Sequence, residues 1–480
     1  MDKLATPCGQ TIGAKCCTSA ACALLILVIG LGWPSQSIVS QPSAPGFRVN
    51  VPYWPAGAAY PSRSIFWLGQ VTPTINSADV RMIYDDSYLK ITVHIIDRRL
   101  WSDESPTSED LTKWDAVTLY LDLDGAIDKP LDARTFRFDA QLGAQPDDPE
   151  RQELYTGSGS RWLAAAVPIS VTTSWRGNWP GDDIDDKGWQ IDFYLPFTSF
   201  GLASPPPPAT SWGVALAVHD RDDAAGAPIP DQRWPETLDP NQPATWGQLH
   251  FGLPDYTPPL AAPGELITVR HGLQGATVAD AHVGGHATCG EGLDHWSEWG
   301  EANYAGYDQF NIQNQWDVSD YPCFSKYFVT FPLDALPTGQ TIVSATVTLY
   351  LFGNAGYQPG EAKVSVIEAL TVAADWDEAT INWNNAPRAL ENISRTRVEP
   401  VDFFDPGVPY TWNVSRAVAD AYTRNIPLRL AFYSADGEYH SGKYFWSSDA
   451  AESVRPTLRV QLGKPLTLTE TLYAPLVVAQ

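Results

Sequence analysis

The chain has 480 residues, more than one ordinary domain holds, so its length predicts two domains. Its formal net charge of −25 argues against partners such as nucleic acid or anionic membrane surfaces, because like charges repel. It contains 40 Pro, 36 Gly, 19 Trp and 20 Tyr but only 2 Met, a composition typical of a secreted β-protein whose many short strands are joined by turns.

The N-terminal segment, residues 1–41, has the pattern of an export signal. Lys3 and Lys15 precede an apolar run from Ala20 to Trp33, and small and polar residues follow it. The run has about 14 residues, fewer than the ~20 that a bilayer-spanning helix needs. We therefore expect a signal peptide and a protein that is secreted or held at the cell surface, with an uncleaved membrane anchor as the alternative.

A proline-rich segment, residues 253–264, is the best candidate for a linker between domains. It separates a first module, residues 42–252, from a second module, residues 265–463, and a C-terminal tail, residues 464–480, follows. Both modules contain runs of alternating apolar and polar residues, such as WQIDFYLP and TVTLYLF, which is the pattern of half-buried strands. Helical spacing is clear in Val414–Arg424. We expect an all-β chain of two consecutive β-sandwich, jelly-roll-like domains.

Two strand-like runs in the first module, Tyr88–Ile96 and Val117–Asp124, flank a polar loop that ends in Lys113-Trp114-Asp115. This layout places a large aromatic residue and a carboxylate at the mouth of a sandwich, where ligands are often bound. Together with GWQIDFYLPFTSFGL, WGVALAVHDRDD and PATWGQLHFG, the stretch resembles family 9 carbohydrate-binding modules and the wider DOMON-like group of β-sandwiches.

The resemblance implies a sugar held between two tryptophans, with polar side chains that read its hydroxyl groups. Trp114 lies where the first tryptophan is expected, Asp115 follows it, and Arg137 lies where an arginine contacts the sugar. The second tryptophan is expected near residues 240–241, which are not aromatic, and Trp234 is the candidate substitute. A pyranose stacks its apolar faces on flat rings, while its hydroxyls need fixed polar partners. The alternative for Trp114 is a residue that only packs the loop.

The same resemblance implies other ligands. A family glutamate that reads hydroxyls corresponds to Thr118 in this chain. Family members often carry structural calcium, and Asp122 and Asp124 place two hard carboxylate ligands at one strand end, although such ends are also common as solvated groups. Some DOMON-like domains bind haem through Met and His, so Met82 and His94 form a candidate haem pair, with two ordinary core residues as the alternative.

The second module resembles DNRLRE-type domains, which are β-sandwiches of extracellular bacterial proteins. The matching segments are FVTFPLDALPTGQTIVSATVTLYLF, DWDEATINWNNAP, TWNVSRAVADAY and SVRPTLRV. Some of these domains bind acidic polysaccharide, but here the expected basic residue is Lys326 in an altered context, and the local charge is unfavourable. The resemblance predicts that Trp383 packs in a buried corner where Asn384 and Asn385 bond to backbone groups.

Residues 281–325 lie outside this resemblance and form an aromatic- and glycine-rich insertion. Cys289 and Cys323 lie in it, and they are the two cysteines outside the expected leader. In an oxidising compartment such a pair most simply forms one disulfide, while the histidines around Cys289 leave a zinc site as the alternative. The insertion is either a second binding face or a capping loop.

These patterns predict a secreted, non-catalytic polysaccharide-binding protein that acts as an accessory to extracellular carbohydrate catabolism. No nucleophile elbow or HExxH motif is present, and no pair of glycosidase carboxylates can be placed in the sequence. The alternatives are an extracellular structural or adhesion protein and a haem-binding redox module.

Overall fold

The computed structural model describes residues 46–466, apart from 56, 59–61, 104, 107–110, 126–128, 144–147, 179, 224, 226–228, 286–291, 316–322, 357, 359 and 402–406. The expected leader, residues 1–41, lies outside the described residues, as do Cys289 and most of the expected tail. The described residues belong to one compact unit. Within the described ranges, helices long and apolar enough to cross a bilayer are absent.

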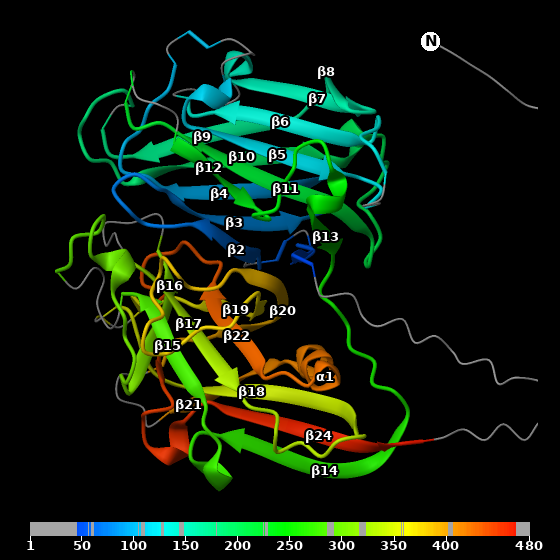
Figure 1. Ribbon diagram of the computed structural model, residues 1–480. Coiled ribbons are helices and arrows are strands. Elements are labelled where there is room, and N and C mark those ends of the chain that lie inside the picture. Colours follow the sequence, from blue (N-terminus) through cyan, green and yellow to red (C-terminus); the bar gives the residue numbers. More distant parts are fainter. Residues whose placement is uncertain are drawn as a thin grey trace, which may run out of the picture. The chain divides into compact units, whose positions relative to one another are not determined.

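The first half of this unit is a sandwich of two sheets (Figure 1). The five-stranded sheet has the order β2, β3, β4, β10 and β9 (Ser64–Gly69, Ser77–Tyr84, Tyr88–Ile96, Gly188–Pro196 and Ser170–Arg176). The facing sheet runs β1, β13, β11, β5, β6, β7 and β8 (Arg48–Val51, Gly247–Phe251, Ser211–Asp220, Ala116–Asp122, Thr135–Gln141, Gln152–Ser158 and Arg161–Ala164). A further strand, β12 (Ile229–Trp234), pairs with the second half of β11.

The second half is also a sandwich. One sheet runs β15, β17, β22, β19 and β20 (Ala279–Gly284, Phe324–Phe331, Leu428–Ser434, Ser365–Val372 and Ala389–Val398). The other consists of β14, β24, β18, β21, β23 and β16 (Ala261–Arg270, Thr457–Pro465, Thr341–Asn354, Val408–Asn413, Lys443–Trp446 and Gln309–Asn314). The described part contains one α-helix, α1 (Ser415–Arg424). The remaining elements are 3₁₀ turns, η1–η7 (Leu111–Lys113, Pro149–Arg151, Phe197–Phe200, Pro243–Thr245, Leu273–Gly275, Trp299–Glu301 and Glu452–Val454).

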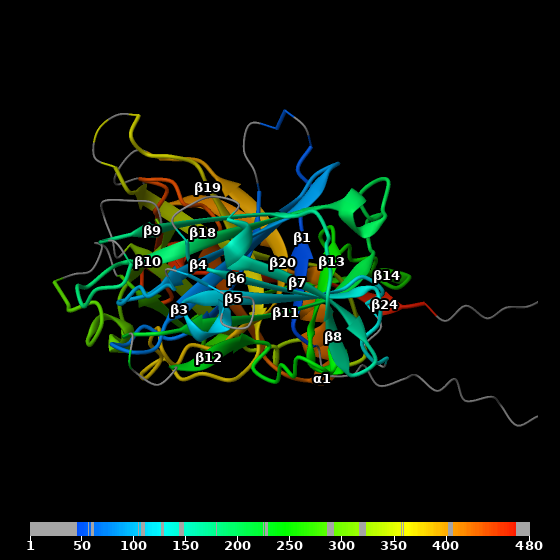
Figure 2. The ribbon, with the colours of Figure 1, turned by 90° about the horizontal axis from the view of Figure 1, so that it is seen from above.

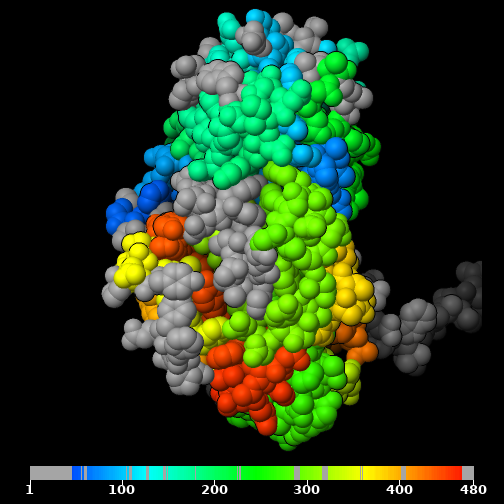
Figure 3. All heavy atoms as spheres, turned by 90° about the vertical axis from the view of Figure 1, so that its left-hand side faces the viewer, coloured from blue at the N-terminus to red at the C-terminus, as the bar shows by residue number. Residues whose placement is uncertain are grey.

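The pairing of β14 with β24 brings distant parts of the sequence together. In the space-filling view, green residues near position 270 lie against orange-red residues near position 450 (Figure 3), and Arg270 Nη2 lies 2.6 Å from Glu452 Oε1. Because β14 begins at Ala261, the last residues of the expected linker are part of a strand.

Two apolar cores hold the unit together. The second core lies between the two sheets of the second sandwich and includes Tyr327, Val329 and Phe331 of β17. The first core fills the first sandwich and continues onto the second, where it includes Phe328 of the same strand. Successive side chains of a strand point to opposite faces, so β17 contributes to both cores.

The prediction of an all-β fold is confirmed. Apolar residues alternate with polar or less buried residues in strands such as β18, whereas β3 and β5 are buried along their whole length. The predicted helix at Val414–Arg424 is present as α1, which begins one position later, at Ser415. Figure 2 shows the unit from above, so that the first sandwich lies nearer to the viewer than the second.

Candidate functional site

The outer face of the first sandwich carries a continuous polar network on four neighbouring strands. Inward-facing residues of β5, such as Val117 and Leu119, belong to the core, whereas Thr118 between them points to the other face. Thr118 Oγ1 lies 2.7 Å from Asp139 Oδ1 of β6 and 2.9 Å from His219 Nε2 of β11. The strands therefore align hydroxyl, carboxylate and imidazole groups in one row.

Charged residues extend this row at both ends. Arg137 Nη2 lies 2.6 Å from Asp139 Oδ2, and its guanidinium carbon lies 5.1 Å from the ring centroid of Tyr155 on β7. At the other end, His219 Nδ1 lies 2.9 Å from Asp231 Oδ1 of β12, and Arg233 Nη2 lies 3.0 Å from Asp231 Oδ2. The outer-face network consists of the following six residues: Arg137, Asp139, Thr118, His219, Asp231 and Arg233.

Exposure within the network rises towards its ends. Thr118 and Asp139 are 1% and 2% exposed, whereas the side chains of Arg137 and Arg233 are 26% and 43% exposed. Burial acts to raise the pKa of Asp231, but the hydrogen bond from His219 and the charge of Arg233 lower it to about 2. The interior of the row is thus fixed by hydrogen bonds, and its two arginines offer N–H donors to solvent.

Aromatic residues lie beside the network on the same face. Tyr120, Trp246 and Leu238 form a small apolar cluster, and Trp162 packs against it half-buried. The ring centroids of Tyr120 and Trp246 are 5.3 Å apart, and those of Tyr120 and Trp162 are 5.9 Å apart. Trp246 is only 6% exposed, so it packs within this cluster.

The predicted sugar-contacting residues differ in how much of each side chain reaches solvent. Arg137 lies at the partly exposed end of the network, as expected for a contact residue. Trp114 is half-buried, and the guanidinium carbon of Arg221 lies 5.3 Å from its ring centroid. Asp115 is fully buried and accepts hydrogen bonds from the backbone N–H groups of Trp101 (2.6 Å) and Arg221 (2.9 Å). Asp115 therefore cannot contact a sugar at the surface.

Trp234 is also a core residue, contrary to its predicted role as a sugar clamp. It is 2% exposed and stacks on Phe66 with ring centroids 4.1 Å apart. In the pairing of β12 with β11, Trp234 lies opposite Leu216 of the core, and Arg233 lies opposite Ala217 of the outer face. The alternation of the strand thus buries the tryptophan and exposes its neighbour.

The predicted calcium ligands Asp122 and Asp124 are held by basic side chains. Lys129 Nζ lies 3.4 Å from Asp122 Oδ1 and 2.6 Å from Asp124 Oδ2, and it also pairs with Asp132. Arg134 forms a second ion pair with Asp124. These contacts lower the pKa of Asp124 and supply the positive charge that a metal would bring.

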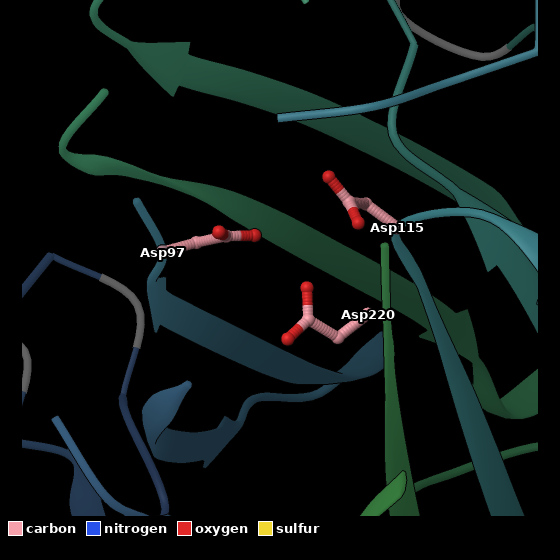
Figure 4. Close-up of side chains that lie close together, drawn as sticks. All are labelled: Asp97, Asp115 and Asp220. Atoms are coloured by element: carbon pink, nitrogen blue, oxygen red, sulfur yellow. The ribbon is translucent and has the colours of Figure 1, made fainter. Parts of the chain in front are cut away.

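Three other carboxylates converge at one end of the first sandwich. Asp97 follows β4, Asp115 precedes β5, and Asp220 ends β11, and Figure 4 shows their side chains pointing toward one another. One oxygen from each lies within 4.8 Å of the others. Because β4 belongs to one sheet and β5 and β11 to the other, the aspartate triad (Asp97, Asp115 and Asp220) joins the two layers.

The triad is buried without enough hydrogen-bond donors. Asp97 Oδ2 has no hydrogen-bond partner among the described residues, and Asp220 meets only weak donors, the Asn76 side chain and the Arg221 backbone N–H, which act to lower its pKa. Burial and the neighbouring carboxylates raise the pKa of Asp97 and of Asp115 well above the usual value, and burial and Asp222 raise that of Asp220 to about 8. Unpaired buried carboxylates are costly, and hard oxygen ligands of this kind suit Ca²⁺. The triad therefore fits a calcium ion.

The haem pairing of Met82 and His94 is wrong for this fold. In the pairing of β3 with β4, Met82 lies opposite Ile91 and His94 lies opposite Asp79. Met82 faces the core, while His94 lies on the other face, where its Nδ1 is 3.4 Å from Asp79 Oδ1. Two ligands on opposite faces of one sheet cannot bind the same haem iron.

The predicted corner of the second module is confirmed. Trp383 is 5% exposed and donates from Nε1 to Ser77 Oγ at 3.2 Å. Asn384 bonds to the backbone of Val71 through both side-chain atoms, at 2.7 and 3.0 Å, and Asn385 donates to the carbonyl of Thr380 at 2.9 Å.

The described part of the aromatic insertion packs against the fold. Trp299 is fully buried, with its ring centroid 4.8 Å from that of Trp383, whereas Tyr307 is 46% exposed. Cys323 is buried and disulfide-bonded. Its expected partner, Cys289, lies outside the described residues, so that pairing stays a prediction.

Two parts of the site were missed by sequence reasoning. Thr118 was noted only as a replaced glutamate, and the triad was not recognised, although Asp97 and Asp220 close strand-like runs and Asp115 precedes one. A period-two pattern can place an aspartate next to a strand, but it does not predict which strand ends lie close together in the fold.

Part of the chain is similar to a family of carbohydrate-binding modules. Residues 297–462 match carbohydrate-binding module family 96. The match covers most of the second sandwich and part of the expected insertion. The likeness to DNRLRE-type domains stays a prediction. No curated protein matches the chain.

Several solved structures are similar at low identity. A proposed carbohydrate-binding protein from Bacteroides uniformis has 14% identity and a TM-score of 0.34, over 43% of this chain and 99% of its own. A family 9 carbohydrate-binding module from Caldicellulosiruptor kristjanssonii in complex with cellotriose has 13% identity and a TM-score of 0.28, over 43% and 93%. TM-scores this low establish neither fold nor function. The family match supports a carbohydrate-binding module within the second sandwich.

Proposed function

We propose that this protein is an extracellular, non-catalytic polysaccharide-binding protein that contacts sugar hydroxyls through the outer-face network. The observation that carries this proposal is the row of fixed polar groups with partly exposed arginines at its ends. The match of residues 297–462 to a carbohydrate-binding family supports the same function. An accessory role in extracellular carbohydrate catabolism is the corresponding biological setting.

The chemistry of the face suits a sugar. Arginine offers several N–H donors in a fixed plane, which suits paired hydroxyls, and the carboxylates of Asp139 and Asp231 accept hydrogen bonds. The half-buried rings of Tyr155 and Trp162 provide apolar surface for C–H groups of a pyranose. A site of this kind binds weakly, and two modules on one polymer would raise the overall affinity.

A calcium ion at the aspartate triad is part of the proposal. When bound, the ion supplies positive charge that neutralises the three buried carboxylates. Asp97 would hold it from the sheet of β4, while Asp115 and Asp220 would hold it from the facing sheet. The role of the triad is then structural, because it fixes the loop that carries Trp114.

The test is retention of the full chain in gels that contain one polysaccharide each, across a panel of neutral and acidic polymers. The Arg137→Ala variant should lose affinity by about tenfold or more, since a hydrogen bond to a charged group contributes ~1.5–3 kcal/mol. Arg134→Ala is the matched control, because Arg134 lies on the same hairpin, is 49% exposed and pairs with Asp124 outside the network.

Two results would contradict the proposal. The first is no retention by any polymer, and the second is equal retention of the Arg137 and Arg134 variants. If the protein attaches to cell surfaces and added free sugars do not reduce this attachment, the adhesion alternative is favoured instead.

A further inference from the structure

A cavity of 320 Å³ lies where the two sandwiches meet. Its walls come from both halves of the unit: β2 and the end of β12 from the first, and β17 and the segment before β20 from the second. The residues that matter for its chemistry are Trp67, Glu236, Lys326, Trp383 and Arg388. Glu236 is 67% exposed, so this edge of the cavity reaches solvent. The volume lies at the low end of the range of small-molecule sites.

Lys326 is buried against this cavity without an anionic contact. Its side chain is 1% exposed, and its Nζ lies 3.5 Å from the ring centroid of Trp383 and 4.4 Å from that of Trp67. Among the residues that the structure describes, Lys326 Nζ has no hydrogen bond and no ion pair within 4.0 Å. The aromatic rings attract the cation, but they cannot accept its hydrogen bonds as a carboxylate would.

The surroundings of Lys326 do not compensate its charge. Burial lowers its pKa well below the usual value; Asp79 opposes this effect and Arg388 adds to it. Asp79 is already engaged, since its Oδ1 lies 3.1 Å from Arg81 Nε and its Oδ2 accepts from Asn314 Nδ2 at 2.8 Å.

Arg388 brings a second basic side chain to the same cavity. Its Nε lies 3.2 Å from Glu236 Oε1, while its Nη1 is buried and has no hydrogen-bond partner among the described residues. Two basic side chains with unused N–H donors therefore line one cavity, although the chain as a whole carries a net charge of −25. A buried donor without a partner is costly, so a ligand that accepts from both groups would be bound favourably.

We propose that this junction cavity binds a small oxyanion, a carboxylate or phosphate group on a ligand no larger than about one sugar ring, through Lys326 and Arg388. Nearby amide side chains, Gln70 and Gln232, offer partners for hydroxyl groups of such a ligand. The site is separate from the outer-face network and does not depend on it. Since its walls come from both sandwiches, the oxyanion also stabilises their contact.

The experiment measures thermal unfolding and calorimetric binding of the full chain at constant ionic strength. The probes are phosphate, sulfate, acetate and glucuronate, added in place of chloride. We expect saturable binding and a rise in Tm with at least one of them. Binding of glucuronate and acetate but not phosphate assigns a carboxylate ligand, and the opposite result assigns a phosphate group.

Three variants make the test specific. Arg388→Gln should weaken binding by about tenfold or more, since it removes a charged donor at the edge of the cavity. Arg397→Gln is the control with the same change in charge, because Arg397 is 53% exposed and pairs with Glu399. Lys326→Met should also lose binding, and Arg388→Gln decides the question if that variant does not fold.

The inference is overturned if none of the four anions binds. It is also overturned if the anions raise the Tm of every variant as much as that of the unsubstituted chain, because salts that are excluded from the protein surface have this general effect. The glycan site can be judged independently. Arg137→Ala should leave oxyanion binding unchanged, and Arg388→Gln should leave retention by neutral polysaccharides unchanged.

Discussion

At the scale of single residues, the aspartate triad lowers the stability of the first sandwich unless a cation is present, because buried carboxylates without enough partners are costly. Its three carboxylates are buried, and they meet too few hydrogen-bond donors among the described residues. Burial raises the pKa of Asp220 to about 8, so the folded state binds a proton that the unfolded chain releases near its ordinary pKa. This contribution to stability is present at acidic pH and is lost as the pH rises through about 8.

The Asp220→Asn variant should therefore be more stable than the natural chain at pH 8 in the presence of a chelator. Calcium should stabilise the natural chain, by about 2.7 kcal/mol at a free concentration one hundred times the Kd, and the variant much less. Denaturant unfolding at pH 5 and pH 8, with and without calcium, measures both effects. Asp183→Asn, at an exposed position, is the control. Calcium that fails to change the stability of the natural chain would exclude the metal site.

Sequence reasoning at this scale succeeded where the position alone decides exposure. Arg137 is partly exposed, as the resemblance implies, because it alternates with the core residue Phe138, and its contact with a sugar stays a prediction. Trp234 was placed wrongly because a resemblance gave it a role that its register does not allow, since it faces the core while Arg233 faces outward. A shift of one residue along a strand changes the face, and pairing fixes that register.

At the scale of elements, the short strand β1 connects the two sandwiches. Asn50 is fully buried in β1, and its side-chain amide donates to Glu391 Oε1 at 2.8 Å and to the carbonyl of Asn392 at 2.6 Å. The Asn392 amide in turn donates to the carbonyl of Asn50 at 2.8 Å. These bonds join β1 of the first sandwich to β20 of the second.

Asn50→Ala should lower the free energy of unfolding by about 1–3 kcal/mol, because it leaves buried acceptors of β20 without their donors. Equilibrium unfolding in urea measures the loss. The control is Asn241→Ala, at an exposed position. Equal effects of the two substitutions would show that the buried amide contacts add nothing to stability.

Strands such as β4, β10 and β18 were predictable because each has a local period-two pattern, but the faces that they cover were not. In β17, Lys326 and Phe328 lie on the face that points away from the second core. The sequence alone would place this face in solvent, although Phe328 is aromatic. The structure buries both against the first sandwich, where Phe328 packs on Trp67 with ring centroids 6.1 Å apart. The hydrophobic period and the residue propensities of a segment predict its secondary structure, but they do not predict which other element packs against it.

At the scale of the whole molecule, one apolar core is shared by the two sandwiches. Trp67 of β2 belongs to it together with Phe328 and Tyr433 of the second half, and the Trp67 and Tyr433 ring centroids are 6.0 Å apart. A core of this kind resembles the interior of one domain more than a contact between independent domains.

Thermal unfolding of the full chain should therefore show one cooperative transition whose calorimetric and van't Hoff enthalpies agree. Two resolved transitions would contradict this expectation. Trp67→Ala removes a large side chain from the shared core, so it should lower the stability of the unit by about 3–5 kcal/mol without separating the halves into distinct melting units.

The shared core also bears on how such a protein evolves. Binding modules are commonly exchanged between proteins as self-contained pieces, each with its own soluble surface. Here the outer face of β17 carries Lys326 and Phe328 in place of solvated side chains. Either half, moved alone into another protein, would expose an apolar surface that invites aggregation. The two sandwiches should therefore be inherited together, as one unit of recombination.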